Sequence, residues 1–165
     1  MTTHSKKIGK VFSYQCDTEE TEQKVVLRKI RYCLKHGIFQ NQIAVISRNN
    51  DIVDRYKSIV PKGVWTGTIF RAKGLEFKRV FLIGAEEGTF PEIHNKNRYS
   101  TVEQIELMEE ERRVFAEGVT RTSDRLYITY ITSLRPNGRK GKPSPFLKEM
   151  GITETTFKTA KDFKK

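Results

Sequence analysis

The feature that most limits what this chain can fold into is its alternation of short apolar runs with segments of helical periodicity. Continuous apolar runs such as Ile43–Ile46 and Val80–Ile83 are typical of strands that are covered on both faces. Other segments, such as residues 101–122, place apolar residues every three or four positions, as an amphipathic helix does. The alternation predicts an α/β fold, a three-layer α/β/α unit with a mainly parallel sheet.

The same patterns predict where each element lies. Strands are expected at residues 11–14, 43–46, 64–69, 79–84 and 126–131. Helices are expected over 17–36, from about residue 51, over 101–122 and from Ser144-Pro145. Asp17 and Glu20 are expected to form a capping box for the first of these helices. Ligands of a parallel sheet meet the carboxyl ends of its strands, so we expect the site in the loops after Ile46, Ile69 and Ile83 and around Arg121.

The long helix carries a charged residue on its expected buried face. Ile105, Met108, Phe115 and Val119 mark that face. Arg112 lies four residues after Met108 and three before Phe115, so it falls on the same stripe. A cation in that position needs a buried partner or a functional reason.

Charge and composition bound the class of protein. The 165 residues carry a formal net charge of +11, which points to a polyanion such as nucleic acid. Residues 1–10 contribute +3 and residues 133–165 contribute +6, which leaves only +2 for the 122 residues between them. No segment is apolar enough for a membrane span or a signal peptide, and the two cysteines form no disulfide framework or metal-ligand pair. We therefore expect a cytoplasmic protein without a membrane partner.

The motifs for nucleotide hydrolysis are incomplete. The phosphate-cradling pattern GxxxxGK[ST] is missing, and the nearest segment, Gly138–Ser144, has the wrong spacing and contains a proline. Glu86 and Glu87 follow an apolar strand, as a metal-binding acid pair would, but without a phosphate loop an ordinary loop is the favoured interpretation. We expect the isolated chain to be inactive as an ATP hydrolase.

Two further segments have unusual residue patterns. Thr68–Phe77 (TIFRAKGLEF) is a strand end followed by a small-residue turn, and Met108–Thr122 (MEEERRVFAEGVTRT) is an acidic helix that ends in Thr-Arg. With IAVISRNN at 43–50 and VFLIGAEEGTFP at 80–91, these segments resemble the C-terminal motor domain of the UvrD/Rep/PcrA group of superfamily 1 helicases. The resemblance divides the chain into a basic extension (1–7), a RecA-like domain (8–150) and a polar basic tail (151–165).

The resemblance implies a nucleotide site that this chain completes but does not form alone. In that family two RecA-like domains clamp ATP with Mg²⁺ between them, so the N-terminal RecA-like domain of the same motor is an expected partner. Arg121 would be the arginine finger, which can be worth about 10³–10⁵ in rate. Glu76 would contact the nucleotide ribose, and Gly74 would permit close approach of the backbone.

The resemblance also implies a track for single-stranded DNA. Arg48 and Asn50 would meet the strand, and Thr68 would donate to a phosphate. The chain departs from the family pattern at Phe70, where histidine is usual, and at Arg71, where a small residue is usual. The segment Met108–Thr122 likewise has Ala116 where the family usually has an aromatic residue.

Three functional hypotheses remain open. Only 17 residues separate Asn50 from Thr68, where UvrD and PcrA insert the 2B domain. That short connection, with PSPFL at 143–147, is similar to the HelD/helicase IV branch, in which RNA polymerase is an alternative partner. The hypotheses are a DNA helicase motor domain, a HelD-like ATPase that remodels RNA polymerase, and a non-catalytic nucleic-acid-binding module that uses its basic ends.

Overall fold

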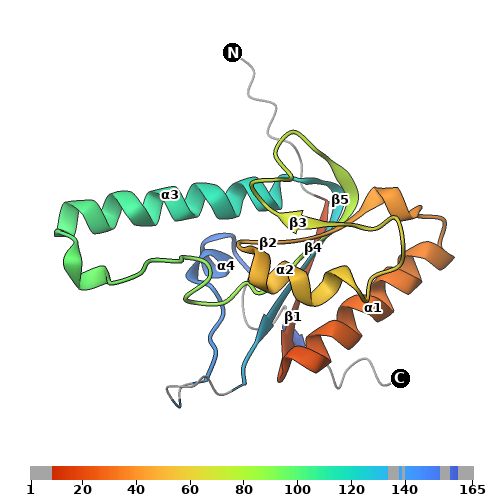
Figure 1. Cartoon of the computed structure of the whole chain (residues 1–165), viewed down its shortest axis with the longest axis horizontal. Helices are drawn as coiled ribbons and strands as arrows, with labels where there is room; N and C mark the ends of the chain where they lie inside the picture. The colour runs from red at the N-terminus through yellow and green to blue at the C-terminus, as the bar shows by residue number, and fades with distance from the viewer. Residues whose placement is uncertain (1–8, 134–137, 139, 153–156, 160–165) are drawn as a thin grey trace.

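A parallel sheet forms the centre of the molecule (Figure 1). The computed structural model describes residues 9–133, 138, 140–152 and 157–159. The strands are β1 (Lys10–Cys16), β2 (Ile43–Ser47), β3 (Trp65–Thr68), β4 (Phe77–Leu82), β5 (Thr122–Ile131) and β6 (Phe157–Thr159). Their order is β3-β2-β4-β5-β1-β6, and each neighbouring pair is parallel. The expected α/β fold and its five strands are confirmed.

One strand was not expected. Phe157–Thr159 pairs with β1 in the register Ser13↔Phe157, so the sheet has six strands and residues 157–159 are not a tail outside the fold. The segment is short and polar, and its pairing partner lies more than 140 residues away in the sequence, so local patterning gave no signal for it. The basic extension 1–7 and the remaining cations after residue 152 lie outside the described residues, apart from Lys158 in β6.

Helices cover the sheet on both faces. The α-helices are α1 (Glu19–Lys35), α2 (Asn50–Lys57), α3 (Thr101–Val119) and α4 (Pro145–Glu149), and the 3₁₀ turns are η1 (Gln40–Gln42) and η2 (Lys96–Arg98). Residues of α1 and α2 pack with Ile43, Val45 and Phe81 on one face, whereas residues of α3 and α4 pack with Ala44, Ile46 and Leu82 on the other. Alternate residues of β2 and β4 thus serve two separate cores, which explains why these strands are apolar throughout.

The start of α1 differs from the expected capping box. Thr18, not Asp17, is the N-cap, and its Oγ1 accepts a hydrogen bond from the backbone N–H of Thr21 at 3.1 Å. Glu20 instead pairs with Lys24 one turn further along the helix, at 3.1 Å. Because Thr18 and Asp17 are both good N-cap residues, composition alone did not separate them.

Helix α3 begins in a capping box and then projects beyond the sheet (Figure 1). Phe115 and Val119 are buried as expected, and Met108 packs half-buried against the core. Ile105 was expected on the same face but is 56% exposed. The N-terminal half of α3 extends past the layers that would cover it, so a correct helical periodicity does not bury its residues there.

None of the helices in the described part of the chain combines the length and apolar composition that crossing a bilayer requires.

Candidate functional site

The three expected DNA contacts lie at one edge of the sheet. β2 and β3 are parallel neighbours, and their last residues, Ser47 and Thr68, are paired in register. Arg48 follows β2 directly, and Asn50 is the first residue of α2. The carboxyl edge of the sheet therefore gathers Arg48, Asn50 and Thr68, as expected for a parallel α/β unit.

Arg48 is held inside the domain by carboxylates. Its Nε and Nη2 donate to the two carboxylate oxygens of Glu111 on α3, at 3.2 and 2.9 Å, and its Nη1 lies 3.6 Å from Glu92. The Arg48 side chain is 19% exposed and that of Glu111 is 9% exposed. The hydrogen bonds to Glu111 raise the pKa of the Arg48 guanidinium above its ordinary value. The guanidinium also lies over the ring of Phe70, 4.9 Å from the ring centroid.

The buried charge on α3 is Glu111, not Arg112. Glu111 is 6% exposed and also accepts a hydrogen bond from the backbone N–H of Glu92 at 3.0 Å. Arg112 lies on the exposed side of the helix, where it makes a two-pronged ion pair with Glu149 and lies over the ring of Phe146. The expectation of a buried Arg112 was wrong by one position, or about 100° of helix rotation.

Asn49 and Thr68 have local structural roles at this edge of the sheet. Asn49, which sequence reasoning did not single out, caps α2 through its Oδ1 and donates from Nδ2 to Glu92 at 3.4 Å. Asn50 is exposed beside it. Thr68 is buried, and its Oγ1 accepts from the N–H of Arg71, which ties the following turn to the end of β3. The preference of asparagine for N-cap positions was the available signal for Asn49.

The expected nucleotide contacts lie at the opposite edge of the sheet. Arg121 follows α3, and its carbonyl accepts a hydrogen bond from the N–H of Phe77, the first residue of β4, at 2.9 Å. The expectation that Arg121 lies near the carboxyl ends of the strands was wrong. α3 returns across the sheet antiparallel to its strands, so its C-terminal end reaches the amino edge.

At the amino edge, Arg121 contacts the turn that carries Gly74 and Glu76. Its Nη1 donates to the carbonyl of Leu75 at 3.4 Å and its Nε to the carbonyl of Glu117 at 3.0 Å. Gly74 has φ +83°, and no atom lies within 4 Å of where its Cβ would be, so glycine is needed here for backbone conformation and leaves open space. Glu76 is exposed. The three predicted nucleotide residues are thus close together in the structure.

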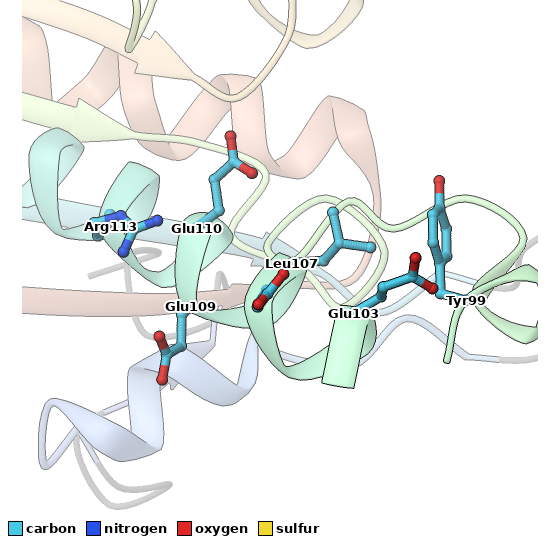
Figure 2. Close-up of a pocket in the computed structure, with 7 residues that line it drawn as sticks. Tyr99, Glu103, Leu107, Glu109, Glu110 and Arg113 are labelled. Atoms are coloured by element: carbon cyan, nitrogen blue, oxygen red, sulfur yellow. The ribbon is translucent and has the colours of Figure 1, made fainter. Parts of the chain in front are cut away.

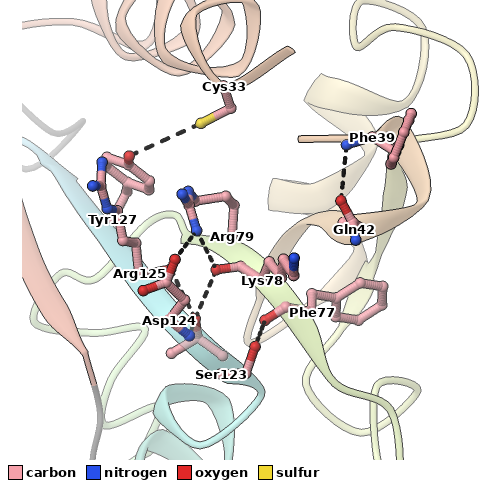
Figure 3. Close-up of polar contacts among 11 residues, drawn as sticks. Cys33, Phe39, Gln42, Phe77, Lys78, Arg79, Ser123, Asp124, Arg125 and Tyr127 are labelled. Carbon is pink, nitrogen blue, oxygen red and sulfur yellow. Dashed lines mark hydrogen bonds and ion pairs between the residues drawn. The ribbon is translucent and has the colours of Figure 1, made fainter. Parts of the chain in front are cut away.

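Polar contacts join the first residues of β4 and β5 next to Arg121 (Figure 3). Arg79 of β4 pairs through Nη1 with the carboxylate of Asp124 in β5 and also donates to the carbonyl of Lys78. The hydroxyl of Ser123 donates to the carbonyl of Phe77 at 3.5 Å. These cross-strand contacts hold β4 and β5 together beside the turn around Arg121.

Glu86 and Glu87 are bound into the loop structure. The Glu86 carboxylate accepts from the N–H of Ile131 at 3.0 Å, and the N–H of Glu87 donates to the carbonyl of Lys142 at 2.9 Å. Across the described ranges, no three His, Cys, Asp or Glu side chains are grouped so that they could hold a metal ion. The Glu86 carboxylate thus has a structural role, and the backbone of Glu87 is tied to the neighbouring loop.

A hollow of about 500 Å³ lies along the projecting part of α3 (Figure 2). Its lining is mostly acidic and comprises Tyr99, Glu103, Glu106, Leu107, Glu109, Glu110 and Arg113. Four carboxylates would repel both a nucleotide phosphate and a nucleic-acid backbone. The hollow includes none of the predicted site residues.

Comparisons with known proteins identify helicases that are similar to this chain. Residues 54–133 match the UvrD-like helicase C-terminal domain family. The chain is 41% identical over 101 residues to the ATP-dependent DNA helicase PcrA of Staphylococcus aureus (strain Mu50), covering 60% of this chain and 13% of that protein. It is 40% identical over 85 residues to DNA helicase II of Haemophilus influenzae, covering 50% of this chain and 11% of that protein. The chain therefore spans only about an eighth of the length of these curated relatives.

A solved structure has the same fold. The crystal structure of the C-terminal domain of a possible DNA helicase from Lactobacillus plantarum WCFS1 superposes with a TM-score of 0.59 at 16% sequence identity. The match covers 92% of this chain and 86% of that one. This similarity supports the expected RecA-like α/β architecture.

Proposed function

We propose that the chain is the C-terminal motor domain of an ATP-dependent DNA helicase or translocase, because residues 54–133 match the UvrD-like helicase C-terminal domain family. Its partners in this role are the N-terminal RecA-like domain of the same motor and single-stranded DNA. The named functions of the PcrA and DNA helicase II relatives support the proposal. No part of it extends to RNA polymerase, because these relatives are DNA helicases.

The state of Arg121 carries the catalytic part of the proposal. Arg48 and Arg79 each pair with a carboxylate. In contrast, the hydrogen bonds of Arg121 run to the carbonyls of Glu117 and Leu75 and to its neighbour's hydroxyl, and none of the ion pairs in the described residues includes it. Carbonyl oxygens position a guanidinium without neutralising its charge. Arg121 is therefore suited to stabilise negative charge that develops on a transferred phosphoryl group.

The surroundings of Arg121 suit a nucleotide that is bound mainly by another domain. Gly74 leaves the backbone open to close approach, and the exposed carboxylate of Glu76 can accept from ribose hydroxyls. Bound ATP with Mg²⁺ supplies the γ-phosphoryl group that is transferred to water. The phosphate cradle and the metal ligands belong, in this proposal, to the N-terminal RecA-like domain.

The decisive experiment measures ATP turnover with and without that domain. We expect the isolated chain not to hydrolyse ATP and the protein joined to its N-terminal half to do so when single-stranded DNA is added. Arg121→Ala in the joined protein should lower turnover by about 10³-fold or more while ATP binding changes little. Arg121→Lys should also fail, because an ammonium lacks the planar donor geometry of a guanidinium.

Arg112→Ala is the matched control, since it removes an exposed arginine from α3, the helix that precedes Arg121, and should leave turnover unchanged. Motor-like hydrolysis by the isolated chain would contradict the proposal. Unchanged turnover in Arg121→Ala would remove Arg121 from its role. Salt-sensitive DNA binding that needs only the basic ends, without ATP turnover in the joined protein, would favour a non-catalytic binding module.

A further inference from the structure

Phe70 is a large aromatic side chain that the structure holds at the surface. It follows β3 at the carboxyl edge of the sheet and is 49% exposed, although its neighbour Ile69 and nearby Ala72 are buried. The N–H of Arg71 donates to the Oγ1 of Thr68, and the N–H of Ala72 donates to the Thr68 carbonyl at 3.1 Å. The backbone that presents the ring is therefore fixed at both of these amides.

The ring is also supported from one side. The guanidinium of Arg48 lies 4.9 Å from the ring centroid, within the range of a cation–π contact. Glu111 orients that guanidinium through two hydrogen bonds, and Glu92 adds an ion pair. Arg48 therefore makes its contacts within the domain. Its guanidinium supports the ring of Phe70, and that ring is the group exposed at the surface.

The charge around the ring suits a polyanion. Arg71 and Lys73 are exposed in the same turn, whereas the acids closest to Arg48, Glu92 and Glu111, are engaged with it. An exposed aromatic ring beside exposed cations is the combination with which proteins bind single strands, because bases stack on the ring and phosphates meet the cations.

We propose that Phe70 is a stacking platform for one base of single-stranded DNA, and that Arg48 and Glu111 are positioning residues that hold it. This inference rests on the proposed function and revises the expectation, drawn from the family resemblance, that Arg48 itself meets the strand. Arg48 acts through Phe70 and does not itself bind a phosphate. Where the family usually has a histidine, Phe70 provides a different kind of DNA contact.

The test compares strands with and without bases. Affinity of the 165-residue chain is measured by fluorescence anisotropy for a labelled oligodeoxythymidine and for a strand of the same length made of abasic sites. Phe70→Ala should weaken binding of the thymidine strand by about 5- to 100-fold. It should leave the weaker binding of the abasic strand within about twofold, because phosphate contacts remain.

Two substitutions separate stacking from apolar contact. Phe70→Trp should retain thymidine binding, since the ring is preserved, whereas Phe70→Leu should be as weak as Phe70→Ala. Phe39→Ala is the matched control, because Phe39 is another exposed aromatic residue, 67% exposed, located after α1. It should not change either affinity.

The positioning role needs its own readout. In a strand that contains 2-aminopurine, stacking on Phe70 should quench the probe, and Glu111→Gln should reduce the quenching at saturating protein. If Glu111→Gln lowers the thermal midpoint too far for the measurement, Arg48→Lys replaces it, since lysine cannot make the two-pronged contact.

Three outcomes would contradict the proposal that Phe70 is a stacking platform. They are unchanged thymidine binding in Phe70→Ala, an equal loss on the abasic strand, and no binding of either strand by the unsubstituted chain. None of these outcomes touches the ATP-turnover test on Arg121, so the failure of this inference and the failure of the proposed function are distinguishable.

Discussion

At the scale of single residues, the Arg48–Glu111 pair links three distant parts of the chain. It joins the end of β2 to the middle of α3, and Glu111 also accepts from the N–H of Glu92 in the connecting loop. Both side chains are largely removed from water, so each depends on the other for its hydrogen bonds. Loss of either partner would leave a charge that water reaches poorly.

We expect Glu111→Ala to lower the free energy of unfolding by about 2–3 kcal/mol, less than for a fully buried pair because Arg48 retains some access to water. Urea denaturation measures the change. Glu149→Ala is the control: it breaks the exposed pair between Glu149 and Arg112, whose side chains are 46% and 45% exposed, and should cost clearly less stability than Glu111→Ala. Equal losses in the two variants would show that Glu111 is not structurally special.

Glu22 is a second buried acid, on the opposite face of the sheet. It is fully buried on α1 and accepts from the hydroxyls of Tyr56 and Thr129, at 2.7 and 2.8 Å. Burial raises the pKa of the Glu22 carboxyl, and these hydrogen bonds offset the increase only in part. The folded protein therefore keeps the Glu22 proton at pH values where an unfolded glutamate, with a pKa of about 4.3, has lost it.

The raised pKa of Glu22 determines how the stability of the folded protein changes with pH. The stability that Glu22 contributes is complete below about pH 4 and declines as pH rises toward the pKa of the folded state. Glu22→Gln removes the titration, so its stability relative to the unsubstituted protein should increase between pH 4 and pH 8. Urea denaturation at several pH values measures this difference, with Glu20→Gln on the exposed side of α1 as control. A difference that does not vary with pH, or that varies with the opposite sign, would contradict the assignment.

At the scale of elements, α3 shows what helical periodicity can and cannot predict. Its existence, its start and the burial of Phe115 and Val119 all followed from the sequence. The exposure of Ile105 did not, because it depends on where the helix leaves the sheet, and the 3.6-residue period contains no information on that.

The two halves of α3 should respond differently to truncation of apolar side chains. Phe115→Ala should cost about 3–4 kcal/mol, because Phe115 is 2% exposed and packs edge-on against Phe90 at 5.2 Å. Ile105→Ala should change stability by no more than about 0.5 kcal/mol, since more than half of the side chain is in water already. A large loss in Ile105→Ala, measured by urea or thermal denaturation, would mean that the projecting half packs against something in solution.

At the scale of the whole molecule, the fold sorts the predicted site into two places. The switch-point rule correctly grouped Arg48, Asn50 and Thr68, because Thr68 ends β3, Arg48 follows β2 and Asn50 begins the next helix, all at the carboxyl edge. It failed for Arg121, which precedes a strand. Motif resemblance supplied the residue types, but only the topology shows that the two groups lie at opposite edges and that α3 runs from one to the other.

Charge is sorted in the same way. The net charge of +11 points to a polyanion, yet α3 presents four carboxylates around one hollow (Figure 2). Exposed cations of the turn after β3, Arg71 and Lys73, lie instead next to the proposed DNA contacts. Binding of a single strand should therefore depend on where the cations lie and not on the overall charge.

The salt dependence of DNA binding tests that localisation. Each phosphate contact on a single strand contributes about 0.7 to the slope of log affinity against log salt concentration. Arg71→Gln with Lys73→Gln should therefore make the slope shallower by about 1.4, measured for oligodeoxythymidine between roughly 50 and 200 mM salt. Arg28→Gln with Lys35→Gln removes the same charge from exposed positions on α1, which covers the other face of the sheet, and should leave the slope nearly unchanged. If both pairs lower the slope equally, the strand is held by overall charge, and the turn after β3 is not part of the track.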